Sequence, residues 1–343
     1  MNCDFKRKLP IPMEIKERFP ITPELAVIRQ KRDEIMKQIL RGEDERRILI
    51  IGPCSADNEE SVLEYTDRLR GLQEKVAEAF FVVPRVYSNK PRTTGQGYKG
   101  MLHQPDPTRK EDVLEGLIKT RQLHLRVFKE TGFTCADEML YPENYRYFSD
   151  LLGYAAVGAR SVEDQQHRLT ASALDVPVGM KNPTSGDRHV LFNALKAAQQ
   201  SHTFIYRGWE VESKGNPYAH AILRGSVNSR GHVKGNYYYD DLQQVSLEYA
   251  ENGLLHPSVI IDTNHANSNK NYLEQGSIAF DVLESCKKSE DINKLVKGFM
   301  IESYLEDGCQ QPGGTVYGQS ITDPCLGWEK TEMLILQMAD RMK

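Results

Sequence analysis

Short apolar runs recur along the chain and alternate with longer stretches in which apolar residues return every three or four positions. The short runs are rich in Val, Ile, Phe and Tyr, which favours strands. Eight of them occur, at 48–51, 80–86, 133–136, 154–157, 176–180, 220–223, 258–261 and 296–301. The clearest helical pattern between them covers 111–130. Strands that alternate with helices form a parallel sheet, and eight repeats predict an α/β fold closed into a (β/α)8 TIM barrel.

Two segments lie outside this repeat. Residues 1–21 are polar and interrupted by prolines, which predicts an extended arm. A helix is expected to begin at Thr22-Pro23, a capping residue followed by a proline, and to end at Gly42. We therefore expect residues 1–42 to form an N-terminal arm and helix, and residues 43–343 to form the barrel. Alternating apolar residues at about 203–218 predict an added β-hairpin before the sixth strand.

Composition limits the class of partner. The chain has 343 residues, 39% of them hydrophobic and 27% charged, as in ordinary globular proteins. Its formal net charge of −4 gives no reason to expect binding to nucleic acid or to anionic membranes. The six cysteines lack C-x-x-C spacing, and neither a secretory signal nor an apolar membrane segment is evident. We therefore expect a reduced, cytoplasmic protein.

Charged residues follow the apolar runs, where parallel α/β proteins bind their ligands. Asp137 and Glu138 follow the third run. Six strand-end residues are cationic: Arg85, Lys90, Arg92, Arg160, Lys181 and Arg224. Each of them alone is an ordinary surface charge. Six at corresponding positions in a net-acidic protein predict a pocket for a small ligand with several phosphate or carboxylate groups.

Four further residues suit a metal ion. Cys54 follows the Gly-Pro turn after the first run, and His265, Glu302 and Asp323 follow later apolar runs or a small turn. One thiolate, one imidazole and two carboxylates suit Mn, Fe, Co or Zn better than Mg. Taken one at a time, Cys54 and His265 also have simpler structural interpretations. Buried cysteines often pack as small apolar side chains, and a single histidine is often a hydrogen-bonding group.

Seven short motifs resemble one family. They are Gly-Pro-Cys-Ser at 52–55, Lys-Pro-Arg-Thr at 90–93, Gly-Ala-Arg-Ser at 158–161, Lys-Asn at 181–182, Leu-Arg-Gly at 223–225, Asn-His-Ala-Asn at 264–267 and Ser-Ile-Thr-Asp at 320–323. From about residue 20 to the C-terminus the chain resembles the type I 3-deoxy-D-arabino-heptulosonate 7-phosphate (DAHP) synthases, in particular the subfamily regulated by aromatic amino acids. The resemblance implies a metal-dependent, aldol-type condensation of phosphoenolpyruvate with erythrose 4-phosphate. This reaction gives DAHP and phosphate and opens the shikimate pathway.

The resemblance also implies roles for the candidate residues. A divalent metal would be bound by Cys54, His265, Glu302 and Asp323. Phosphoenolpyruvate would be surrounded by Arg85, Lys90, Glu138, Arg160, Lys181 and Arg224. Erythrose 4-phosphate would be received by Lys90, Pro91, Arg92 and Thr93. The catalytic candidates are Cys54, Lys90, Glu138 and His265. Among them we expect Lys90 to protonate the new alkoxide, and either Glu138 or metal-bound water to activate the attacking water. The two substrates carry about five negative charges, which fits six cations.

Three further expectations concern regulation, redox state and assembly. In regulated members of the family an N-terminal arm, the segment before the fifth strand and the hairpin build a pocket for an aromatic amino acid. Residues 169–175 depart from the familiar pattern, so no effector is assigned. Cys325 lies two residues after Asp323, and we hypothesise that oxidation links it to Cys54. A homodimer or homotetramer is the default assembly.

Two alternative functions stay open. One is the related octulosonate 8-phosphate synthase, which uses arabinose 5-phosphate. The other is a non-catalytic barrel that senses aromatic amino acids.

Overall fold

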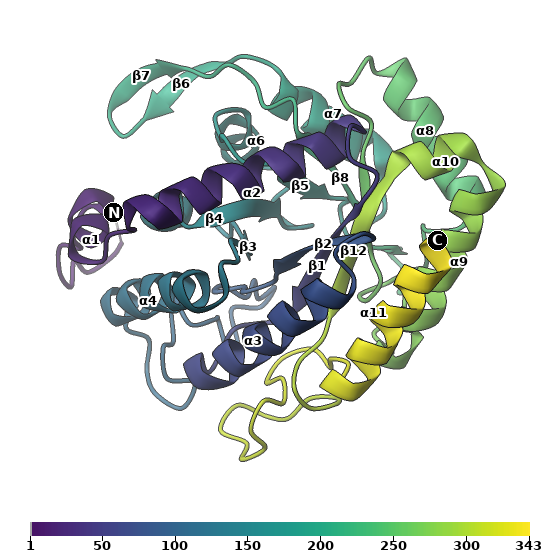
Figure 1. Ribbon diagram of the computed structural model, residues 1–343. Helices are drawn as coiled ribbons and strands as arrows, with labels where there is room; N and C mark the ends of the chain where they lie inside the picture. Colours follow the sequence, from purple (N-terminus) through teal and green to yellow (C-terminus); the bar gives the residue numbers. More distant parts are fainter. Residues whose placement is uncertain (1) are drawn as a thin grey trace.

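The computed structural model describes residues 2–343 and confirms a barrel of eight parallel strands (Figure 1). Its strands are β1 (Arg47–Gly52), β2 (Phe80–Pro84), β3 (Cys135–Glu138), β4 (Leu152–Val157), β5 (Val178–Lys181), β8 (Ala219–Leu223), β11 (Val259–Asp262) and β12 (Val296–Glu302). They pair in the order β2-β1-β12-β11-β8-β5-β4-β3. A parallel bridge between Arg85 and Ala136 joins the two ends of this order. Each strand overlaps one of the eight predicted runs.

Every residue of most barrel strands is buried, because the strands pack on both faces. Alternate residues of β1 belong to two apolar clusters. Leu49 and Ile51 pack outward against the surrounding helices, while Ile48 and Ile50 fill the barrel interior. This two-residue alternation is the geometric consequence of strand structure.

Helices surround the barrel and follow its strands. They are α3 (Glu59–Lys75), α4 (Val113–Thr131), α5 (Pro142–Phe148), α6 (Gln165–Ser172), α7 (Arg188–Gln199), α8 (Tyr239–Glu251), α9 (Gln275–Lys288), α10 (Glu290–Leu295) and α11 (Trp328–Met342). A single-turn 3₁₀ helix, η1 (Tyr272–Glu274), precedes α9. No helix in residues 2–343 combines the length and apolarity that crossing a membrane requires.

The predicted N-terminal helix is α2 (Pro23–Arg41). The Thr22 hydroxyl accepts a hydrogen bond from the Leu25 amide at 3.3 Å, and Gly42 ends the helix with a left-handed φ of 78°. Met36 and Ile39 of α2 pack into the same cluster as the inward-facing side chains of β1. The helix therefore covers one end of the barrel interior.

Two sequence-based expectations need correction. The arm is not extended throughout, because Pro12–Arg18 forms the short helix α1. Pro12 occupies its first turn, and Glu14 accepts a hydrogen bond from the Ile11 amide at 2.8 Å. The added hairpin is present but shorter than predicted, with strands β6 (Thr203–Tyr206) and β7 (Trp209–Glu212) joined by the turn at 207–208. A second small ribbon pairs β9 (Ser226–Val227) with β10 (Val233–Lys234).

Candidate active site

The carboxyl ends of the barrel strands surround a cavity of about 520 Å³. Nearly all the site residues predicted from the sequence line it: Cys54, Arg85, Lys90, Pro91, Arg92, Thr93, Glu138, Arg160, Lys181, Arg224, His265 and Asp323. Glu302 is the exception, since its side chain is fully buried behind Arg85. Residues that are far apart in the sequence thus meet at one end of the barrel.

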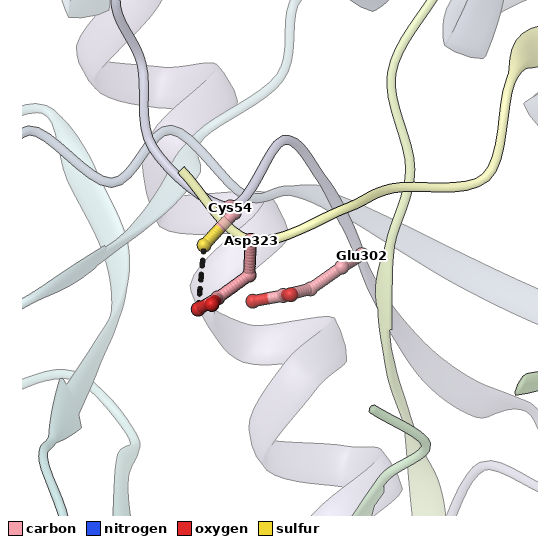
Figure 2. Close-up of side chains that lie close together, drawn as sticks. All are labelled: Cys54, Glu302 and Asp323. Carbon is pink, nitrogen blue, oxygen red and sulfur yellow. Dashed lines mark hydrogen bonds between the residues drawn. The ribbon is translucent and has the colours of Figure 1, made fainter. Parts of the chain in front are cut away.

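Three of the four predicted metal ligands form a compact group (Figure 2). Ligand atoms of Cys54, Glu302 and Asp323 lie within 4.8 Å of one another. They come from the loop after β1, the end of β12 and the loop before α11. The Cys54 Sγ lies 3.4 Å from Asp323 Oδ2. A thiolate and two carboxylates at this spacing fit a divalent transition metal.

His265 lies at the edge of this group. Its Nε2 is 3.9 Å from Glu302 Oε1, and its Nδ1 is 2.8 Å from Asp262 Oδ2 at the end of β11. Burial alone would raise the pKa of Asp262, but the nearby His265 lowers it well below its usual value. A carboxylate on Nδ1 leaves Nε2 free to bind a metal, as in many histidine ligands.

The ammonium group of Lys90 lies beside two of the predicted metal ligands, Cys54 and Asp323. Its Nζ lies 2.6 Å from Cys54 Sγ and 2.9 Å from Asp323 Oδ2. Burial alone would lower the pKa of Lys90, but Cys54 and Asp323 raise it above its usual value. Burial raises the pKa of the Cys54 thiol to about 11, and the Glu302 carboxylate adds to this rise. Loss of the Cys54 proton beside two carboxylates therefore needs a further positive charge, and the donor set fits a metal ion.

Arg85 joins the ligand group to the rest of the cavity. It is almost fully buried, and its Nη2 lies 2.7 Å from Glu302 Oε1 and 3.1 Å from the Cys54 carbonyl oxygen. The guanidinium stands 4.1 Å from the centre of the Tyr87 ring. Its Nε and Nη1 have no hydrogen-bond partner among residues 2–343. Two buried donors are therefore left for a ligand.

Glu138 and Lys181 form a second buried ion pair, with Glu138 Oε2 2.7 Å from Lys181 Nζ. Burial alone would raise the pKa of Glu138, but Lys181 lowers it below its usual value. The preceding Asp137 accepts hydrogen bonds from the Ser88 amide at 2.9 Å and from the Glu138 amide at 2.7 Å. Asp137 thereby ties the segment that carries Lys90 to the end of β3.

The outer part of the cavity is basic and more open. Arg160 is exposed, Arg224 is half-buried, and the Arg92 Nε donates to the Tyr98 carbonyl oxygen at 2.8 Å. Free cations at the mouth of a cleft attract anionic ligands. The site thus combines buried, paired cations at its base with more exposed ones at its entrance.

Two residues of the cavity were missed from the sequence. Tyr87 stacks beneath Arg85 and also lies 5.2 Å from Lys181 Nζ. Its position directly after the second apolar run could have identified it. Lys270 donates to Asp323 Oδ1 at 3.2 Å. It lies in a turn with left-handed backbone at Asn269 and Lys270, which no pattern in the sequence indicates.

The two cysteines of the redox hypothesis are both buried and both carry free thiols. The Cys325 Sγ lies 3.6 Å from the Asp323 carbonyl oxygen, and it also contacts the backbone of Cys54. Their proximity agrees with the hypothesis, which stays a prediction.

Comparison with known proteins gives one consistent result. The family model described as the DAHP synthetase I family matches residues 18–336. The Tyr-sensitive phospho-2-dehydro-3-deoxyheptonate aldolase of Salmonella typhimurium is 38% identical over 95% of this chain and 91% of its own length. The Trp-sensitive enzyme of Escherichia coli K12 is 36% identical over 96% and 93%. A solved phospho-2-dehydro-3-deoxyheptonate aldolase from Francisella tularensis superposes with a TM-score of 0.91 at 30% identity, covering 99% of this chain and 98% of that one.

Proposed function

The chain belongs to the DAHP synthetase I family and is an enzyme of that family, and from this premise we propose that it condenses phosphoenolpyruvate with erythrose 4-phosphate. The products would be DAHP and phosphate, at the entry to aromatic amino-acid biosynthesis. One observation carries the proposal. Six strand-end cations line a single cavity beside a Cys54, Glu302 and Asp323 ligand group. Two phosphorylated substrates, one with a carboxylate, match that charge.

The residues divide the chemistry between them. Arg85 and Lys181 hold the anionic groups of phosphoenolpyruvate at the base of the cavity, where water is largely excluded. Arg92 and Thr93 receive the phosphate of the aldose nearer the mouth. A divalent Mn, Fe, Co or Zn ion held by Cys54, His265, Glu302 and Asp323 would polarise the aldehyde oxygen as a Lewis acid.

Two residues handle protons. As C3 of phosphoenolpyruvate bonds to the aldehyde carbon, Lys90 donates a proton to the oxygen that becomes a hydroxyl. Water then adds at C2 and passes a proton to Glu138, whose pairing with Lys181 keeps it ionised. Phosphate leaves when the C2–O bond of the resulting hemiketal phosphate breaks.

A coupled assay of phosphate release tests the reaction. We expect turnover with erythrose 4-phosphate, loss of turnover with EDTA and recovery with added divalent metal. Turnover with arabinose 5-phosphate instead would favour the octulosonate 8-phosphate synthase, and no turnover with either sugar would favour the non-catalytic sensor. Glu138→Gln should lower kcat by roughly 10²–10⁴-fold. Undiminished turnover in that variant would remove Glu138 from the proton-transfer role.

We also propose that an aromatic amino acid regulates the enzyme. The names of two relatives describe them as Tyr-sensitive and Trp-sensitive. A second cavity of about 500 Å³ is lined by residues of α1, α5 and the β6–β7 hairpin. Arg146 lines it, and its Nε has no hydrogen-bond partner among residues 2–343. Asp175 also lines this cavity, so we place the effector's carboxylate on the Arg146 side.

Inhibition assays with each aromatic amino acid test this regulatory proposal. We expect one of them to inhibit, and Arg146→Gln to weaken that inhibition while leaving uninhibited turnover unchanged. Full activity in the presence of all three amino acids would contradict it.

A further inference from the structure

A cavity of about 720 Å³ opens at the end of the barrel opposite the candidate active site. Arg47 and Val296, the first residues of β1 and β12, line it together with α9, α10 and the end of α11. Figure 1 shows the C-terminus beside α9, consistent with this lining. The active-site cavity lies at the carboxyl ends of the same strands. Cavities of this size commonly hold small molecules.

The lining of this basal cavity is strongly basic. It has seven cationic residues, Arg46, Arg47, Lys287, Lys294, Lys297, Arg341 and Lys343, against three acidic ones, Asp44, Glu45 and Glu290. Five of the cations have a carboxylate within 4.0 Å. Within residues 2–343, Arg47 and Lys297 are the two that form no ion pair.

Arg47 is held rigidly but keeps one donor unused. It is 8% exposed, its Nη1 donates to the Val296 carbonyl oxygen, and its Nη2 donates to Asn293 Oδ1 at 2.6 Å. Its Nε has no partner among the described residues. An arginine stays charged at all ordinary pH values, so this guanidinium is buried without a counter-ion. Such a group is stabilised when an anion fills the space beside it.

Lys297 supplies a second charge at the same place. Burial and the charge of Arg47 lower the pKa of Lys297. Gly42 adjoins it with a left-handed φ, and a Cβ at that position would lie 3.3 Å from Lys297 Nζ. The glycine therefore leaves the ammonium room next to the cavity. Two neighbouring cations that repel each other and lack a carboxylate form an incomplete electrostatic arrangement.

We propose that the basal cavity binds a small, multivalent, phosphate-bearing anion between Arg47 and Lys297. A guanidinium matches phosphate oxygens with directed hydrogen bonds, and an ammonium adds a compact charge. The site is independent of the proposed condensation, since it shares no lining residue with the active-site cavity.

Calorimetric titration with inorganic pyrophosphate tests this site. Inorganic phosphate, which has a single phosphate group, serves as the comparison. Pyrophosphate can also bind the cations of the active-site cavity, so the basal site is identified as the binding phase that Lys297→Gln weakens. We expect this phase to hold one pyrophosphate per chain, bound more tightly than phosphate and more weakly as salt rises. Lys297→Gln should weaken this binding at least about tenfold, the effect of losing one charged hydrogen bond.

Lys288→Gln is the matched control. Lys288 is exposed at the end of α9, does not line the cavity and loses the same charge on substitution. Arg47→Lys is the second test variant, because it keeps the charge and removes the directed donors. Equal affinity in wild type and Lys297→Gln, or equal weakening in Lys288→Gln, would overturn the proposal. Because the comparison is between variants, binding of pyrophosphate at the active-site cavity does not affect it.

Discussion

At the scale of single residues, the site depends on buried ion pairs. Glu138 and Lys181 lie 2.7 Å apart, and both are more than nine-tenths buried. Removing one partner leaves an uncompensated charge, so Lys181→Met should lower the free energy of unfolding by about 3–5 kcal/mol. The double variant with Glu138→Gln should recover much of that loss. Urea unfolding of the two single variants and the double variant measures the coupling. A loss below 1 kcal/mol in Lys181→Met would contradict it.

A buried carboxyl outside the site makes the stability depend on pH. Asp33 of α2 is buried, with its Oδ2 3.6 Å from Arg29 Nη2, and burial raises its pKa to about 6. The pKa in the unfolded chain is about 3.9. The folded state holds the Asp33 proton more tightly than the unfolded chain does, so this protonation stabilises the fold. The stabilisation is complete below about pH 4 and is lost as pH rises through 6. Two pKa units correspond to roughly 3 kcal/mol.

Asp33→Asn is uncharged at every pH and should escape that loss. We expect it to exceed wild type in the free energy of unfolding by up to roughly 3 kcal/mol at pH 7.5, with the gap closing toward pH 4.5. Asp281→Asn, at an exposed position on α9, is the control. A gap that does not change with pH would show that Asp33 is ionised equally in both states.

The candidate site was largely predictable because its residues follow strands that the apolar pattern identifies. Cys54 and Lys181 could be assigned to one end of the barrel without coordinates, since all parallel strands point there. Lys270 could not, because its approach to Asp323 depends on two left-handed residues in a turn. The position of His265 relative to the ligand group could not be predicted either, because it depends on the contact of His265 with Asp262.

At the scale of elements, α2 shows how local signals and packing agree. Its start is fixed by the hydrogen bond from the Leu25 amide to the Thr22 hydroxyl. Thr22→Ala should therefore lower the free energy of unfolding by about 1 kcal/mol, while Thr22→Ser should be nearly neutral. Thermal or urea unfolding of both variants separates the cap from other effects of position 22. Equal stability of the alanine and serine variants would argue against the cap.

Short elements were harder to predict than long ones. The eight strands and α2 carry repeated apolar positions, which the pattern detects. By contrast, α1 spans only Pro12–Arg18 with Pro12 and Ile15 buried, too few apolar positions to show a period. The hairpin was expected from alternation, yet its Trp209 is 74% exposed. Alternation indicated strand structure there but could not indicate which face, if any, is covered.

At the scale of the whole molecule, one group of exposed apolar side chains lies on the N-terminal segment and the hairpin. Phe5, Met13 and Val27 are exposed in the first, and Ile205 and Trp209 in the second. The two regions are neighbours, since Met13 and Arg207 line the same cavity. Large apolar side chains grouped in this way mark contact surfaces. We therefore predict a homodimer or homotetramer that covers them.

Light scattering during size-exclusion chromatography tests this assembly. Wild type should elute at two or four times the chain mass, and Ile205→Glu with Trp209→Glu should shift it toward smaller species. Both substitutions lie on exposed hairpin positions, so the barrel core should stay intact. Leu255→Glu, exposed on a different segment, should leave the mass unchanged. A monomeric wild type at micromolar concentration would mean that these side chains are covered by another partner or by none.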